Sequence, residues 1–136
     1  MIIQGATLTG VTVTDASPTT ANLVLYYNPA NTASYSGSGT TINSLAPTNL
    51  TGTMTSITYT SPYFSYNGSS SKVAVADNSI LEPSAGNWTM EVWVNITAST
   101  SAGTVLGKFG NGGASSAVSY SVRVNSGGNI YAQYGD

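Results

Sequence analysis

The sequence predicts an all-β protein, a two-sheet antiparallel sandwich. Short runs rich in Val, Ile, Thr and Tyr recur along the chain, and clusters of Gly, Ser, Asn and Pro separate them. No window places apolar residues at the spacing of a helix face together with capping residues. Aromatic residues make up 10% of the chain and the formal net charge is only −2, which is unlike a disordered chain. We therefore expect one folded domain.

The expected strands follow one another at intervals set by turns. The first 14 residues alternate loosely and are followed by a Pro-containing linker, DASPTT. In order, the expected strands cover residues 22–27, 51–59, 63–66, 72–75, 88–96, 104–109, 120–125 and 129–133. Asn67-Gly68 predicts a tight turn, and Ser-Gly-Gly at 126–128 predicts a hairpin between the last two strands.

Composition excludes several classes of function. The chain has neither Cys nor His, which excludes disulfides, thiol catalysis, Ser-His-Asp triads and ordinary zinc sites. Three basic residues are too few for a nucleic-acid interface, and no apolar run has the length of a membrane span. We expect no cofactor and no metal, because Asp77-Asn78 reads as a turn rather than a calcium site. The start, MIIQGATLTG, lacks the pattern of a signal peptide, and the initiator Met favours folding in the cytoplasm.

Five motifs occur in a recognisable order from Leu23 to the end of the chain. They are LVLYYNPANTASYSGSGTTINSL, NLTGTM, YFSYNGSSSKVAVADNSIL, NWTMEVWVNITASTSAGTVLGKFG and YSVRVNSGGNIYAQYGD. In this order they resemble the concanavalin A-like, laminin-G-type jelly-roll family, which often occurs in structural proteins of tailed bacteriophages, cyanophages among them. The resemblance implies a jelly-roll domain over residues 21–136. The family's jelly roll continues for several more strands, so the resemblance implies either an abbreviated fold or a protein that continues beyond Asp136.

Three departures from the family pattern weaken any inherited ligand site. Asn28 stands where an acidic residue is common, Ile42 where a Trp is common, and Asn67 where an Asp is usual. Each change removes a charge or a large aromatic ring.

The strand at 88–96 decides whether an enzyme is expected. Glycoside hydrolysis needs two carboxylates, but on a strand Glu91 shares its face with Thr89, Trp93 and Asn95. Nothing in the sequence requires Asp77 or Glu82 to approach it, so we expect no catalytic residue and no enzyme. The opposite face is an apolar stripe that we expect to form the core. Its residues are Trp88, Met90, Val92, Val94 and Ile96.

Outward aromatic residues and the N-terminal segment are the candidate contact sites. Trp93 and Tyr131 could stack on a sugar ring, although a lone outer aromatic more often covers a neighbouring strand or chain. Residues 1–20 are expected to be either an arm that adds to another subunit or the first strand plus a linker. The residues of this candidate arm are Ile2, Ile3, Leu8, Val11 and Val13.

These observations and the resemblance together predict a non-catalytic virion structural protein. It would be a capsid-decoration, fibre or tail-associated protein of a phage, acting in particle assembly and surface display. Its expected partners are other virion proteins and further copies of itself, with no nucleic acid and no membrane. The alternative is a carbohydrate-binding adhesin or receptor-binding module that contacts a host surface glycan. A glycoside hydrolase is the least favoured of the three.

Overall fold

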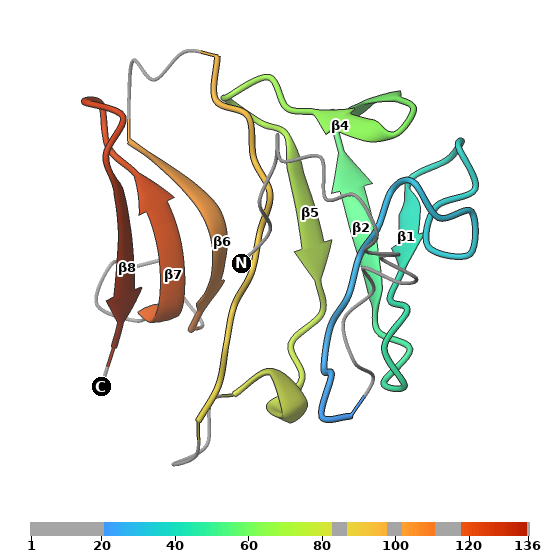
Figure 1. The fold of residues 1–136 in the computed structure, drawn as a ribbon, viewed down its shortest axis with the longest axis horizontal. Helices are drawn as coiled ribbons and strands as arrows, with labels where there is room; N and C mark the ends of the chain where they lie inside the picture. Colours follow the sequence, from blue (N-terminus) through green and yellow to red (C-terminus); the bar gives the residue numbers. More distant parts are fainter. Residues whose placement is uncertain (1–20, 83–86, 98–101, 111–117, 136) are drawn as a thin grey trace, which may run out of the picture.

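The computed structural model describes residues 21–82, 87–97, 102–110 and 118–135 (Figure 1). Its strands are β1 (Thr41–Asn43), β2 (Thr51–Thr55), β3 (Thr58–Thr60), β4 (Tyr63–Ser65), β5 (Lys72–Val75), β6 (Gly103–Phe109), β7 (Val118–Val124) and β8 (Ile130–Tyr134). One short 3-10 turn, η1 (Ser79–Leu81), follows β5. Within the described ranges there is no α-helix. The prediction of an all-β protein is confirmed.

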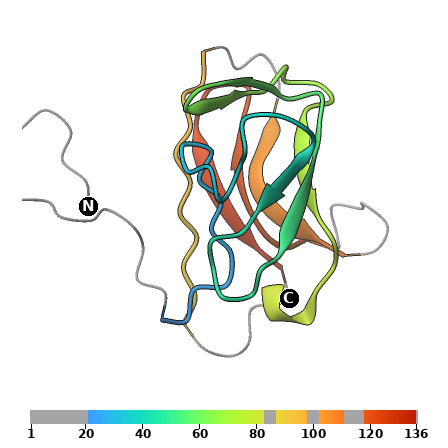
Figure 2. The ribbon, with the colours of Figure 1, turned by 90° about the vertical axis from the view of Figure 1, so that its right-hand side faces the viewer.

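The strands among the described residues all pair antiparallel and form three sheets. Their orders are β1-β2-β5, β3-β4 and β6-β7-β8. Figure 2 shows the β1-β2-β5 sheet in front of the β6-β7-β8 sheet, as two layers. This layering is consistent with a β-sandwich.

The main cluster of buried side chains lies in the first half of the chain, and Val124 is buried separately on β7. Tyr35, Ile42 and Met54 are buried there, and Ile42 has no exposed surface. The rings of Tyr35, Tyr59 and Phe64 meet edge to face, with centroids 4.9, 5.2 and 5.7 Å apart. This is a favourable arrangement of aromatic rings. The core therefore joins the β1-β2-β5 sheet to the β3-β4 hairpin.

Several strands form at the positions that the sequence predicts. Those expected at 63–66, 72–75 and 104–109 correspond to β4, β5 and β6, and β7 and β8 form the predicted hairpin. The run at 51–59 is divided into β2 and β3. The division lies at Ser56, whose φ of 51° is in the left-handed region that a continuous strand does not visit.

The strand predicted at 22–27 is wrong. This segment forms no ladder, and its backbone instead makes single hydrogen bonds with the loop after β1, one of them from the Leu45 amide to the Tyr26 carbonyl at 2.8 Å. The Tyr26 amide donates to Ser44 Oγ at 3.1 Å, and Thr48 Oγ1 donates to the Val24 carbonyl at 2.6 Å.

The strand predicted at 88–96 is also wrong. Residues 87–97 run as a chain without a ladder between β5 and β6 (yellow to orange in Figure 1). β5 pairs with β2, and β6 pairs with β7. The expected core stripe is wrong as well, because four of its five members are exposed and the fifth, Met90, is only half-buried. The exposed fractions are 41% for Trp88, 40% for Val92, 49% for Val94 and 43% for Ile96.

The candidate arm, Ile2 to Val13, lies outside the described residues. Among the residues that are described, no helix has the length and apolar character needed to cross a membrane.

Candidate functional site

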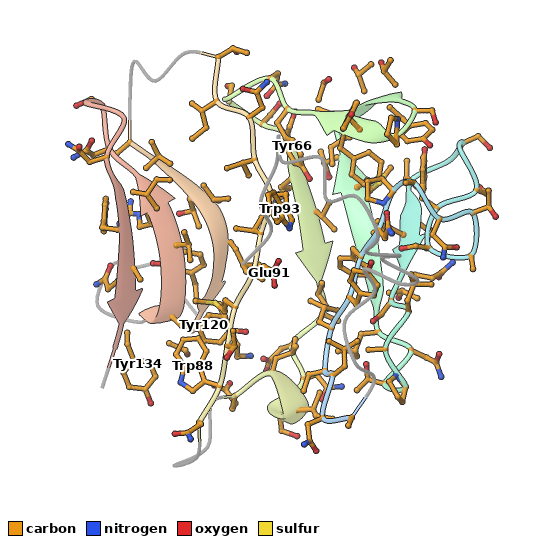
Figure 3. The ribbon with its side chains drawn as sticks, in the orientation of Figure 1. Tyr66, Trp88, Glu91, Trp93, Tyr120 and Tyr134 are labelled. Carbon is orange, nitrogen blue, oxygen red and sulfur yellow. The ribbon has the colours of Figure 1, made fainter. Side chains whose placement is uncertain are left out.

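The candidate site is a row of side chains across the β6-β7-β8 sheet. Lys108 on β6 is directly opposite Tyr120 on β7, which is directly opposite Tyr134 on β8. Opposed residues of an antiparallel pair point to the same face, so these three side chains are neighbours. Trp88 lies over the two tyrosines (Figure 3). Its ring centroid is 5.3 Å from that of Tyr120 and 5.8 Å from that of Tyr134.

The turn between β7 and β8 fixes the register that makes this row. Asn125 Oδ1 accepts hydrogen bonds from the amides of Gly127 and Asn129, both at 3.0 Å. Gly128 has a φ of 77°, a conformation that favours glycine. A slip of one residue would turn Tyr134 to the other face of the sheet. The Asn-Ser-Gly-Gly-Asn turn therefore positions the aromatic side chains.

The row ends in a cluster of charges. Lys108 Nζ forms ion pairs with Asp77 Oδ1 and, at 3.0 Å, with Glu82 Oε1. Asp77 follows β5, and η1 brings Glu82 back toward β6. The Asn78 side chain caps η1 by accepting a hydrogen bond from the Ile80 amide at 3.0 Å. The cluster thus ties the loop after β5 to the β6-β7-β8 sheet.

The ion pair between Lys108 and Asp77 shifts the pKa of both groups. The hydrogen bond from Lys108 and its positive charge hold the pKa of Asp77 below the ordinary value of 3.8. The hydrogen bond to Asp77 in turn raises the pKa of Lys108 above 10.5. Burial, chiefly, raises the pKa of Tyr120. Around neutral pH Asp77 is therefore a carboxylate, Lys108 an ammonium group and Tyr120 a neutral phenol.

The aromatic part of the row is partly open to solvent. Trp88 is 41% exposed and Tyr134 57% exposed, whereas Tyr120 is half-buried. Next to the tyrosines on the same face lies the apolar cross-strand row Leu106, Val122 and Ala132. Chemically, this surface offers ring faces for stacking and carboxylate oxygens for hydrogen bonds at one end.

Glu91 and Trp93 lie where alternation predicts, on one side of their segment. Trp93 Nε1 donates a hydrogen bond to Glu91 Oε1 at 3.1 Å, and both side chains are labelled in Figure 3. Trp93 is 66% exposed. Both side chains are exposed, as expected, although the opposite side of the segment is exposed too. The loop acids Asp77 and Glu82 contact Lys108 instead of Glu91.

Tyr131 belongs to the other face of β8. It is opposite Arg123, whose guanidinium carbon lies 5.8 Å from the centre of the Tyr131 ring. None of the ring contacts among the described residues joins Tyr131 to Trp93. The structure therefore places the two predicted sugar-binding residues in separate surroundings.

The sequence reasoning missed the row of Trp88, Tyr120 and Tyr134. The two tyrosines could have been found from the predicted hairpin. A register centred on Ser-Gly-Gly places Tyr120 opposite Tyr134. The apolar alternation at 88–96 predicts a core position for Trp88. Its contact with the tyrosines joins residues that are far apart in the sequence, so no local pattern indicates it.

No protein-family model, curated protein or solved structure matches this chain. Within the described part of the chain, no group of three Asp or Glu residues is placed to hold a metal ion.

Proposed function

We propose that this chain is a non-catalytic structural protein of a phage virion, built on a laminin-G-type jelly roll. It acts in particle assembly and surface display as a capsid-decoration, fibre or tail-associated protein. The order of the five motifs supports the class of protein. The observation that carries the assembly role is the exposed apolar segment at residues 87–97.

Residues 87–97 combine exposure with a sequence that is mainly apolar and carries a single charge. Trp88, Val92, Val94 and Ile96 are each at least 40% exposed, and Glu91 is the only charged side chain in the segment. Contiguous apolar surface of this kind is typical of a site that another protein covers. A strand of a partner protein paired with this segment would bury these side chains and form hydrogen bonds with the backbone of residues 87–97.

The outer edge of β8 offers a second place for association. Among the described strands β8 pairs with β7 alone, and its sequence, IYAQY, has neither a charge nor a proline. Exposed edges are usually protected by such residues, since an unprotected edge pairs with other chains. Strand addition at β8 by another virion protein or another copy supports the same role.

The charge cluster argues against hydrolysis. A glycosidase needs one carboxyl group that stays protonated to act as the acid. Lys108 has the opposite effect on Asp77, because it lowers the pKa of that carboxyl group. Glu91 accepts its hydrogen bond from Trp93.

Particle incorporation tests the proposal. Purified particles should contain the chain at a fixed copy number by quantitative mass spectrometry. Val94→Glu should reduce that copy number, because it places a charge on the apolar side of the exposed segment. Asn95→Glu adds the same charge to the neighbouring position and should be incorporated normally. Absence of the chain from particles, or equal incorporation of both variants, contradicts the role given to this segment.

A further inference from the structure

We propose that the loop between β4 and β5 modifies itself at Asn67. The side-chain amide is converted to a carboxylate through a cyclic imide that forms with the backbone nitrogen of Gly68. The loop covers residues 66–71, at the top of Figure 1, and shares no residue with the segment at 87–97 or with β8. The proposal is therefore independent of the assembly role.

The side-chain carbonyl of Asn67 is surrounded by hydrogen-bond donors. Its Oδ1 accepts hydrogen bonds from the backbone amides of Ser69, Ser70 and Ser71, at 2.9, 2.9 and 3.0 Å. Donors that point at a carbonyl oxygen stabilise the negative charge that develops there when a nucleophile attacks the carbon. The three amides therefore make Cγ of Asn67 more reactive than in an unfolded chain.

Two further hydrogen bonds hold the donors in place before any reaction. The Asn67 amide donates to Ser71 Oγ at 3.0 Å, and the Ser71 hydroxyl donates to the Ser56 carbonyl. Ser56 lies between β2 and β3, so this chain of bonds connects the loop to the turn between those strands. Donors that are already aligned need no rearrangement at the moment of attack.

Gly68 supplies the nucleophile. Its nitrogen follows Asn67 directly in the chain, so attack on Cγ is intramolecular and closes a succinimide ring. Among the described residues, the Gly68 amide donates no hydrogen bond. Gly68 is exposed, and nothing lies within 4 Å of the position that a Cβ would take. A base from solvent can therefore reach the amide proton.

The leaving nitrogen also has a partner. Asn67 Nδ2 donates a hydrogen bond to Ser70 Oγ at 3.1 Å. Once Cγ is tetrahedral, this nitrogen is a basic amine, and the Ser70 hydroxyl can turn to donate its proton. The bond from Gly68 N to Cγ forms, the bond from Cγ to Nδ2 breaks, and ammonia leaves. Water then opens the imide to aspartate or isoaspartate, and no other reactant is needed.

The loop suits the aspartate product as well as the asparagine. Backbone amides that converge on one oxygen form the kind of concave site that holds anions. Hydrogen bonds to a carboxylate are stronger than those to a neutral amide oxygen. An aspartate at position 67 therefore keeps the same three donors, and it adds one negative charge to a chain whose formal net charge is −2.

Other asparagine turns of the protein lack part of this arrangement. Asn28 Oδ1 accepts a single backbone amide, and the next residue is Pro29, which has no amide proton to lose. Asn78 likewise accepts a single backbone amide, and Ser79 follows it. Of the asparagines that the structure describes, Asn67 alone precedes a glycine.

Peptide mapping by mass spectrometry in heavy-oxygen water tests the proposal. The folded chain should incorporate heavy oxygen at Asn67 about tenfold faster, or more, than the same chain denatured in guanidinium chloride, because only the fold aligns the three amides. Ser70→Ala should slow the reaction about threefold or more, since it removes the proton donor to the leaving nitrogen. Ser69→Ala keeps the backbone amide and should react like the original chain.

Two results overturn the proposal. One is a rate at Asn67 in the folded chain that is equal to or below the rate in the denatured chain. The other is equal rates in Ser70→Ala and Ser69→Ala. Both serines are exposed, so both variants should fold, and circular dichroism checks this.

Discussion

The two aromatic trios of this protein have similar side chains and opposite surroundings. Tyr35, Tyr59 and Phe64 pack in the first half of the chain, where β1, β2, β5 and the β3-β4 hairpin enclose them. The other trio, over the β6-β7-β8 sheet, stays partly exposed. The difference shows that aromatic clustering alone does not make a core. Enclosure requires a second layer over the rings.

Hydrogen bonding explains part of the difference. Tyr35 Oη donates to the Gly39 carbonyl and Tyr59 Oη to the Pro29 carbonyl, both at 3.0 Å. A buried phenol needs such a partner, so these loops allow the rings to be enclosed. In the second trio, Trp88 belongs to a segment that pairs with no described strand. This single segment is all that covers the two tyrosines among the described residues, so part of the ring surface stays exposed.

The largest expected effect separates the packed half from the open half. Ile42→Ala should lower the free energy of unfolding by about 2–5 kcal/mol, because it leaves a cavity at a side chain with no exposed surface. Ile130→Ala removes the same atoms from a residue that is 64% exposed and should cost less than about 1 kcal/mol. Urea denaturation followed by circular dichroism measures both. Equal losses would contradict the placement of the core.

A pair of strand glycines gives the next largest effect. A Cβ at Gly52 would lie 2.6 Å from Val73 Cγ1 and 3.0 Å from Ile42 Cγ2, so Gly52→Ala should destabilise by about 1–3 kcal/mol. At Gly103 nothing lies within 4 Å, and Gly103→Ala should stabilise by up to about 1 kcal/mol through the unfolded chain. Thermal melts of the two variants should therefore shift in opposite directions, and shifts of one sign would count against this packing.

The smallest effect concerns the charge cluster and its pH dependence. The pKa of Asp77 lies below 3.8 in the folded protein, so its stabilising contribution is complete above that pH. It is lost as the pH falls through the lowered pKa, because the unfolded chain binds the proton more readily. Lys108→Met should remove this acid-dependent loss, while Lys72→Met should keep it. Urea midpoints measured at several pH values from about 2 to 7 compare the variants. The change should be small, since Asp77 is exposed.

Local patterns predicted the β6-β7-β8 sheet well. The alternating strands and the Ser-Gly-Gly turn are sufficient to define a hairpin, and β7 and β8 form there. The same reasoning failed at 22–27 and 88–96. A period of two shows which side chains share a face, but it does not show that a partner strand is present. At 22–27 the hydroxyls of Ser44 and Thr48 and the Leu45 amide bond to the backbone, and no strand pairs with it.

The candidate site was less accessible to sequence reasoning than the fold. Alternation correctly placed Glu91 and Trp93 together. The contacts of Lys108 with Asp77 and of Trp88 with Tyr120 join residues more than 30 positions apart. Such contacts depend on how the layers pack, and no local spacing encodes that. The exposure of Val92 and Val94 likewise follows from the layers rather than from the apolar pattern.

Hydrogen exchange of the isolated chain, resolved by residue at low concentration, tests the contrast between the two halves most directly. Amides of β2 around Met54, between β1 and β5, should exchange slowest, because they are bonded and lie over the packed core. Amides of residues 90–96 should exchange close to the rate of an unstructured chain. Protection of Val92 and Val94 equal to that of Met54 would mean that the segment is a paired core strand, and would contradict the open surface proposed for it.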